Sequence, residues 1–178
     1  MFGHFAVIPF ITPYLVENVG FERKEITLVY LVGGLATIIT NPRVGRWADR
    51  TDKHRVFTIM AALSIIPILI LTNMPPIPLW MALVVTGSFF VLAGGRMVPS
   101  TAIVTSVIKP RNRGSFMSLN SSVQNMTAGV ASIAAGILVT VPEGAHHVYG
   151  FWKVGVIGAV FTLIAMWLMS RIKALTLE

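Results

Sequence analysis

Charged residues that could hold helix ends together are concentrated in one short segment, "GRWADRTDKHR", which runs from Gly45 to Arg55 between two long apolar stretches. An aspartate at a helix N-terminus and a cation at a helix C-terminus both complement the helix dipole. Asp49 and Arg50 can therefore pair with each other or with neighbouring helix ends, and Lys53 and Arg55 extend the charged set. Gly45 permits close backbone approach where the preceding stretch ends. Such a segment can form a conformational latch, although charge alone is also compatible with a solvated turn.

One basic residue, Arg96, lies well inside an apolar stretch. If that stretch crosses a membrane, a charge at this depth costs at least about 2.5 kcal/mol. We expect either a structural arginine that pairs or snorkels near the cytoplasmic end, or a residue that binds an anionic substrate or gates a pathway. No Asp or Glu lies deep in any apolar stretch to pair with it, since Glu17 is near the outer boundary.

Three further polar side chains share one helix face. Asn120, Gln124 and Thr127 have the spacing of neighbours on a helix surface. They can form hydrogen bonds between helices, each worth about 0.6 kcal/mol in lipid, or they can contact a substrate or a partner surface. His4 lies at the edge of the first apolar stretch, where it is either structural or a group that takes part in proton coupling.

Enzyme and metal chemistry have little support in the sequence. The chain has no cysteine, which rules out disulfides and thiolate metal sites. It has neither a Walker phosphate-binding loop nor a G-x-S-x-G nucleophile motif. His146 and His147 have only Glu143 near them, which favours a solvated loop over a metal site. We therefore expect no enzymatic activity, no metal and no cofactor.

The composition indicates an all-α integral membrane protein. The mean hydropathy is +0.76 and only 12% of the 178 residues are charged, whereas soluble domains average about 25%. A membrane-spanning helix needs about 20 mostly apolar residues. On this criterion the chain is a single six-helix transmembrane bundle over residues 1–178. The predicted spans are 2–19, 26–44, 55–73, 79–107, 114–141 and 148–170.

The distribution of basic residues predicts the orientation. Cytoplasmic loops near membrane spans are enriched in Lys and Arg. Ten basic residues lie in the linkers after even-numbered spans and in the tail, and three lie on the other side, so both termini are expected to be cytoplasmic. The net charge of +7 does not indicate nucleic-acid binding, because the basic residues form short clusters between apolar spans. The ten are Arg43, Arg46, Arg50, Lys53, Arg55, Lys109, Arg111, Arg113, Arg171 and Lys173.

The spans differ in polarity. The third has little beyond Ser64, and the sixth has one interior hydroxyl, Thr162, which predicts that both spans face lipid. The first and fourth spans hold more polar groups and are expected to face the interior of the bundle. The polar residues of the fourth span are Thr86, Ser88, Arg96, Ser100, Thr101 and Thr105.

The charged segment resembles the loop signature of the major facilitator superfamily, G-x-x-x-D-[RK]-x-G-[RK]-[RK]. Gly45, Asp49, Arg50 and Lys53 match it, and Asp52 stands where the signature has its second glycine. The segment also lies between the second and third spans, as it does in that family. "GHFAVIPFITPYL" and "RGSFMSLNSSVQNMTAGVASIAAGIL" are similar to helices of the proton-driven drug or sugar efflux branch.

The resemblance implies a twelve-helix transporter made of two six-helix halves, each with two inverted three-helix repeats and a substrate site near the midplane between the halves. Six spans correspond to one half. The degraded signature and the short basic tail favour the C-terminal half, cut near the start of its first helix. The implied activity is proton-coupled efflux of a small molecule by alternating access across a bacterial inner membrane. Implied partners are the substrate, membrane lipid, and either a missing N-terminal half or a second copy.

Two other interpretations remain open. One is a complete six-helix protein that dimerises into a transporter or channel. The other is a membrane-bound enzyme or assembly factor. Six further spans encoded upstream would separate the half-transporter from the dimer.

The predicted topology can be tested by cysteine labelling, because the chain has no native cysteine. A cysteine at Thr51 or Ser115 is expected to react with an impermeant maleimide only from the cytoplasmic side, and one at Gly144 only from outside. Labelling is measured in intact cells and in inverted vesicles. The reverse pattern would contradict both the orientation and the number of spans.

Overall fold

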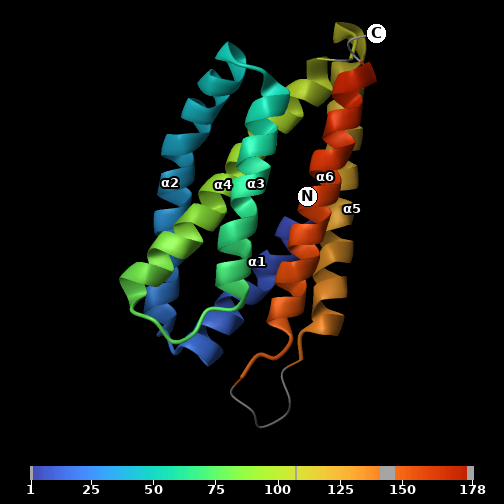
Figure 1. The fold of residues 1–178 in the computed structure, drawn as a ribbon. Helices are drawn as coiled ribbons and strands as arrows, with labels where there is room; N and C mark the ends of the chain where they lie inside the picture. The colour runs from blue at the N-terminus through green and yellow to red at the C-terminus, as the bar shows by residue number, and fades with distance from the viewer. Residues whose placement is uncertain (1, 107, 141–146, 176–178) are drawn as a thin grey trace.

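The chain folds almost entirely into helices. A computed structural model describes residues 2–106, 108–140 and 147–175. These ranges contain no β-strand, only an isolated bridge between Thr140 and Tyr149. A π-helix, Leu15–Val19, continues the first α-helix, and a 3-10 turn, Pro110–Asn112, precedes the fifth. The α-helices are α1 (Phe2–Tyr14), α2 (Arg23–Arg50), α3 (Lys53–Thr72), α4 (Leu79–Ser106), α5 (Arg113–Leu138) and α6 (Phe151–Leu175) (Figure 1).

The charged segment is helical, which corrects the expectation of a loop. α2 continues through Arg50 and α3 begins at Lys53, so only Thr51 and Asp52 connect the two helices. The Asp52 carboxylate caps α3 by accepting a 2.9 Å hydrogen bond from the backbone N–H of His54. Both connecting residues have negative φ, −128° and −70°, so this turn forms without a glycine. The predicted latch residues are thus Gly45, Asp49 and Arg50 at the end of α2, and Lys53 and Arg55 at the start of α3.

The turn between α5 and α6 is longer than predicted. Thr140 and Tyr149 exchange two backbone hydrogen bonds of 3.0 and 2.9 Å. Because this pairing draws the chain out of helical geometry, α5 ends at Leu138 and α6 begins at Phe151. Residues 141–146 lie outside the described part of the chain, and they include Glu143, Gly144 and His146.

The helices form two groups of three that meet along α3 and α6. α4 packs against α2 and α3, whereas α1 packs against α5 and α6. In Figure 1, α2, α3 and α4 lie on the left, α5 and α6 lie on the right, and α1 lies low in the centre. The contact between α3 and α6 joins the two groups into one bundle.

α1 is enclosed by the other helices and forms part of the main apolar core. Val7 is fully buried. The Tyr14 hydroxyl donates a 3.0 Å hydrogen bond to the carbonyl oxygen of Met74, just after α3. Asn18, in the π-helix, bonds both backbone groups of Val148, at 2.7 and 3.0 Å. These contacts tie the end of the first helix to the ends of α3 and α6.

Among the residues that the structure describes, four helices, α2, α3, α4 and α6, are long and apolar enough to cross a membrane. α1 has only 13 residues before the π-helix, and the first half of α5 carries many hydroxyl and amide side chains, so neither meets both criteria. α3 and α6 expose apolar side chains, such as Ile66 at 57% and Leu163 at 53%, as expected of lipid-facing helices. Four spans are therefore supported by length and composition, and six stays a prediction.

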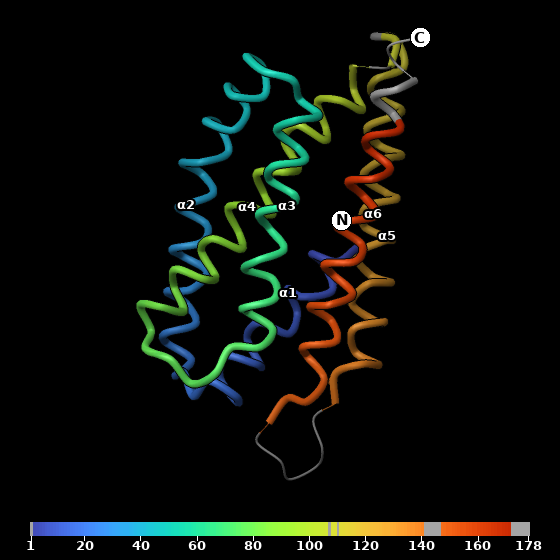
Figure 2. Tube along the Cα trace, viewed as in Figure 1, coloured from blue at the N-terminus to red at the C-terminus, as the bar shows by residue number. Residues whose placement is uncertain are grey.

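The linkers predicted to be cytoplasmic lie at the same end of the bundle. The α2–α3 turn, the α4–α5 connection and the C-terminal end of α6 are at the top of Figure 2. These segments carry Arg46, Lys53, Arg111 and Arg171 among other basic residues. The opposite end holds the π-helix and the α3–α4 connection. The charge asymmetry of the sequence is thus an asymmetry between the two ends of the bundle.

The contact between α3 and α6 predicts a sensitive glycine. A Cβ added at Gly155 would overlap the side chain of buried Thr72. We expect Gly155→Ala to lower the free energy of unfolding by about 1–3 kcal/mol through overpacking, measured by thermal unfolding in detergent. Gly129→Ala is the control, since a Cβ there meets no atom within 4 Å, and it should be neutral or slightly stabilising. Equal losses in both variants would contradict this account of the packing.

Candidate functional site

Arg96 of α4 is buried where three helices meet. Its side chain is 7% exposed, and it is the one Asp, Glu, Lys or Arg among the buried residues that the structure describes. Its Nη1 donates hydrogen bonds to Thr162 Oγ1 of α6 at 3.0 Å and to Ser64 Oγ of α3 at 3.4 Å. Arg96 therefore does not extend toward the end of α4, because the two hydroxyls hold it inside the bundle.

The two hydroxyl groups are oriented to accept. Thr162 donates its own proton to the carbonyl oxygen of Gly158 at 2.8 Å, and Ser64 donates to that of Ala61 at 2.7 Å. Because a hydroxyl has one proton, the lone pairs remain available for the guanidinium. Within the described ranges no carboxylate pairs with Arg96. Some of its N–H donors therefore have acceptors, while its positive charge has no negative partner.

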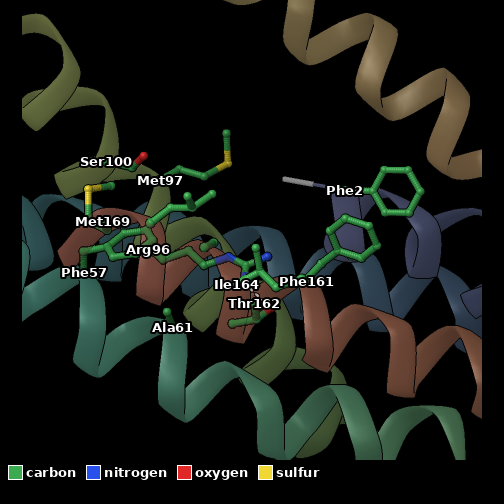
Figure 3. A pocket seen from close by; sticks show the side chains of 13 residues that line it. Phe2, Phe57, Ala61, Arg96, Met97, Ser100, Phe161, Thr162, Ile164 and Met169 are labelled. Carbon is green, nitrogen blue, oxygen red and sulfur yellow. Dashed lines mark hydrogen bonds between the residues drawn. The ribbon is translucent and has the colours of Figure 1, made fainter. Parts of the chain in front are cut away.

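A cavity of about 360 Å³ borders the guanidinium, with walls from α1, α3, α4 and α6. Figure 3 shows the Arg96 side chain extending from the region of Phe57 toward Phe161. The rings of Phe2 and Phe161 stack with their centroids 4.5 Å apart and close one side. Met169 adds a sulfur-containing side chain. The arrangement is a mostly apolar chamber with one cationic group.

His4 is part of the core and not of this chamber. It is the third residue of α1, and its side chain is only 8% exposed. Its ring stacks on Phe89 at 4.7 Å between centroids. Its Nδ1 has no hydrogen-bond partner among the described residues. The neighbouring Gly3, by contrast, lines the Arg96 cavity.

A second cavity, of about 20 Å³, lies between α4 and α5. It brings together two members of the predicted polar face, while the third, Thr127, lies outside its lining and donates to the carbonyl oxygen of Val123 at 2.7 Å. The structure therefore places Asn120 and Gln124 in one cavity, and Ser100 borders both this cavity and the one that Arg96 lines. The polar lining of the smaller cavity is Ser100, Thr101, Thr105, Asn120 and Gln124.

The charged turn forms a separate hollow of about 320 Å³ against the end of α4, where Ile103 and Ser106 complete its lining. Asp49 and Arg50 are exposed, and within the described residues neither side chain forms a hydrogen bond or ion pair, so the predicted pairing between them is absent. A Cβ on Gly45 would lie an ordinary 3.6 Å from Val98 Cγ1, so the approach of α2 to α4 does not require glycine there.

Sequence reasoning missed the partners of Arg96 and the aromatic lining of its cavity. Ser64 and Thr162 were recognisable from the sequence as hydroxyls near the middle of mainly apolar helices, but their common target depends on how three helices pack. Phe57 and Phe161 carry no polar signal that distinguishes them from core residues. Besides Arg96 itself, a hydroxyl near the middle of a mainly apolar helix is thus a sequence signal that pointed to this site.

The tie between Arg96 and α6 predicts a specific loss of stability. Thr162→Val keeps the shape but removes an acceptor from a buried guanidinium, and we expect a cost of about 1–3 kcal/mol in unfolding free energy, measured by thermal unfolding in detergent. Thr127→Val is the matched control, because its hydroxyl bonds only its own helix. Adding Arg96→Met to Thr162→Val should cost less than the sum of the single variants. Additive losses would argue against the tie.

Comparison with known proteins places the chain in a family. A model of the Major Facilitator Superfamily matches residues 1–176. No curated protein and no solved structure matches the chain. The family match and the apolar helices indicate a multi-pass membrane protein with a small-molecule substrate. The chain therefore belongs to the major facilitator superfamily, whose members are membrane transporters and not enzymes.

Proposed function

We propose that this chain is the C-terminal six-helix half of a secondary transporter, which exports a small molecule in exchange for protons by alternating access. Both termini face the cytoplasm of a bacterial cell, and the bundle spans the inner membrane. No cofactor takes part. Substrate passes along the α4 and α5 side of the bundle, where Arg96, Asn120 and Gln124 lie in adjoining cavities.

The observation that carries this proposal is the mirrored packing of the helices. The two groups have the same pattern of contacts if α1 is matched with α4, α2 with α5 and α3 with α6. Under this matching, the contacts of α1 with α5 and α6 correspond to those of α4 with α2 and α3. The contact between α3 and α6 maps onto itself, and that between α2 and α3 maps onto that between α5 and α6. Two three-helix units related in this way are the architecture of each half of this superfamily.

The exposed charges at the end of α2 support a latch toward another part of the transporter. Asp49 and Arg50 have no partner within the described chain, and they flank a hollow that α4 helps to line. A carboxylate at this position is stabilised by a helix N-terminus or a cation that approaches in one conformational state only. The partner group then belongs to the other half.

A complete six-helix protein that dimerises is the second candidate. It is favoured by an apolar stripe along α5 whose side chains are 54–75% exposed in the single chain. A second copy, another half or lipid can cover such a stripe. The stripe consists of Leu119, Val123, Met126, Val130, Ile133 and Ile137.

Two experiments separate these candidates. Six further spans encoded upstream in the same reading frame support the half-transporter, whereas a stop codon there supports the dimer. In proteoliposomes with an imposed pH gradient, the chain alone is expected to move none of three labelled probes, ethidium, arabinose and naphthalene-2-sulfonate. Co-reconstitution with the upstream half should produce proton-driven flux of at least one probe. Flux from the chain alone would refute the half-transporter.

The latch predicts a kinetic effect of Asp49→Asn in the assembled transporter. Loss of one exposed charge at a helix end should slow turnover about two- to fivefold while membrane insertion is retained. Equilibrium binding of substrate should change less, because a latch stabilises one conformational state and does not contact the ligand. Lys24→Gln removes an exposed charge at the opposite end and serves as the control. Unchanged turnover in Asp49→Asn would contradict the latch and support a turn that serves only to set the membrane topology.

A further inference from the structure

The segment that follows α1 is the one π-helix among the described residues. The backbone N–H of Gly20 bonds the carbonyl oxygen of Leu15, five residues earlier, whereas an α-helix bonds the residue four positions earlier. The turn therefore holds one residue more than an α-helical turn. Just before it, Pro13 lacks an N–H and leaves the carbonyl oxygen of Pro9 without its usual intrahelical donor. Because π turns inside α-helices are rare and are frequent at functional sites, this segment is a candidate for a conformational change.

The side chain of Asn18 anchors the π-helix to the turn before α6. Its Oδ1 accepts a 2.7 Å hydrogen bond from the backbone N–H of Val148, and its Nδ2 donates a 3.0 Å hydrogen bond to the carbonyl oxygen of the same residue. The next residue, Tyr149, exchanges two backbone hydrogen bonds with Thr140. The Asn18 amide thus bonds Val148 as a paired strand residue would. We call this contact the Asn18 clasp, and none of its atoms lies in the first turn of α1.

An α-helical turn in place of the π-helix would change which side chains this end of α1 presents to the core. With one residue fewer in the turn, the residues after it advance by one position, about 100° around the helix axis. Val19, which is 8% exposed, would leave the core, and Asn18 would be carried toward its place and away from Val148. Leu15 lies before the turn and would stay buried. The clasp and the α-helical form therefore exclude each other.

We propose that the end of α1 is a register switch. In one conformation the segment is π-helical and the Asn18 clasp is closed, as observed here; in the other the segment is α-helical and the clasp is open. Gly20 follows with a φ of 88°, a backbone conformation that glycine adopts without strain, and provides a joint after the segment.

The location of the switch gives it a role in transport. Alternating access requires the two ends of the pathway to open in turn. The π-helix lies at the end of the bundle opposite the basic linkers (Figure 2), where a change of register alters the packing between α1 and the turn before α6. This role rests on the proposed transport function, whereas the existence of the two registers does not.

The alternative is that Asn18 is a static anchor for the turn before α6. That role accounts for the two hydrogen bonds. It does not account for the π-helix, because an α-helix with one residue fewer could present the same amide to Val148. A static anchor also predicts that loss of the amide loosens this end of α1 as a whole, including Leu15. The register switch predicts that Val19 is released while Leu15 stays in place.

The experiment measures how fast single cysteines react with a maleimide in the full chain in nanodiscs, where both membrane faces are accessible. The chain has no native cysteine, so Val19→Cys and Leu15→Cys report on the positions after and before the turn. Asn18→Leu removes the clasp and supplies an apolar side chain for the place of Val19 in the α-helical form. Asn125→Leu, at an exposed position of α5, is the matched control for the same change. Labelling is followed by mass spectrometry.

We expect Asn18→Leu to raise the labelling rate at Val19→Cys by about tenfold, because two hydrogen bonds no longer stabilise the π-helical form. The rate at Leu15→Cys should stay unchanged, and Asn125→Leu should change neither rate. Equal acceleration at both cysteines would indicate local unfolding and overturn the proposal. Unchanged labelling at Val19→Cys would overturn it as well.

A deletion distinguishes a change of register from a loss of packing. Removing Val16 takes the extra residue out of the segment, so that an α-helical turn keeps both Leu15 and Val19 in the core. In this background Asn18→Leu should no longer accelerate labelling at Val19→Cys. Acceleration that persists contradicts the switch, and so does rapid labelling of both cysteines in the deletion variant itself. Because labelling requires no flux, failure of this inference is distinct from failure of the transport function, which the proteoliposome assay tests separately.

Discussion

The constraint on which this structure depends is that one positive charge is held inside an otherwise apolar bundle. In lipid there is no water to solvate a misplaced polar group, so partners must come from the protein itself. Arg96 obtains them from helices of both three-helix groups, Ser64 of α3 and Thr162 of α6. The hydrogen bonds therefore reinforce the α3–α6 contact that joins the groups. Displacing either helix would expose a guanidinium to hydrocarbon, which favours the observed packing over a slipped register.

Much of the fold could be predicted from the sequence, because apolar length determines helices in a membrane. The four helices that are long and apolar enough to cross a membrane fall within predicted spans, and the differences lie at their ends. The predicted α2–α3 connection was too long because the charged residues between the two helices were assigned to an exposed loop. Charged side chains also extend from the ends of long helices, and a cap by Asp52 lets α3 begin directly. Local capping chemistry was thus the missing part of the prediction.

The candidate site was predictable only in outline. The depth of Arg96 in its helix follows from counting residues, but its partners depend on the tertiary arrangement. The scarcity of polar residues in α3 and α6, with little beyond Ser64 and Thr162, predicts that both helices face lipid. Both helices do expose apolar faces, yet these two hydroxyls are buried and bind the charge. His4 illustrates the same limit, since its place near the start of the first helix gave no indication of the Phe89 ring against it.

The two-residue connection between α2 and α3 has a mechanical consequence. A trans backbone spans at most about 3.6 Å per residue, so the Cα atoms of Arg50 and Lys53 cannot separate by more than about 11 Å. The ends of the two helices are consequently tethered, and there is almost no slack for one to tilt independently of the other at this end. A displacement of the exposed end of α2 therefore also displaces the start of α3. This is the helix whose Ser64 hydroxyl accepts a hydrogen bond from Arg96.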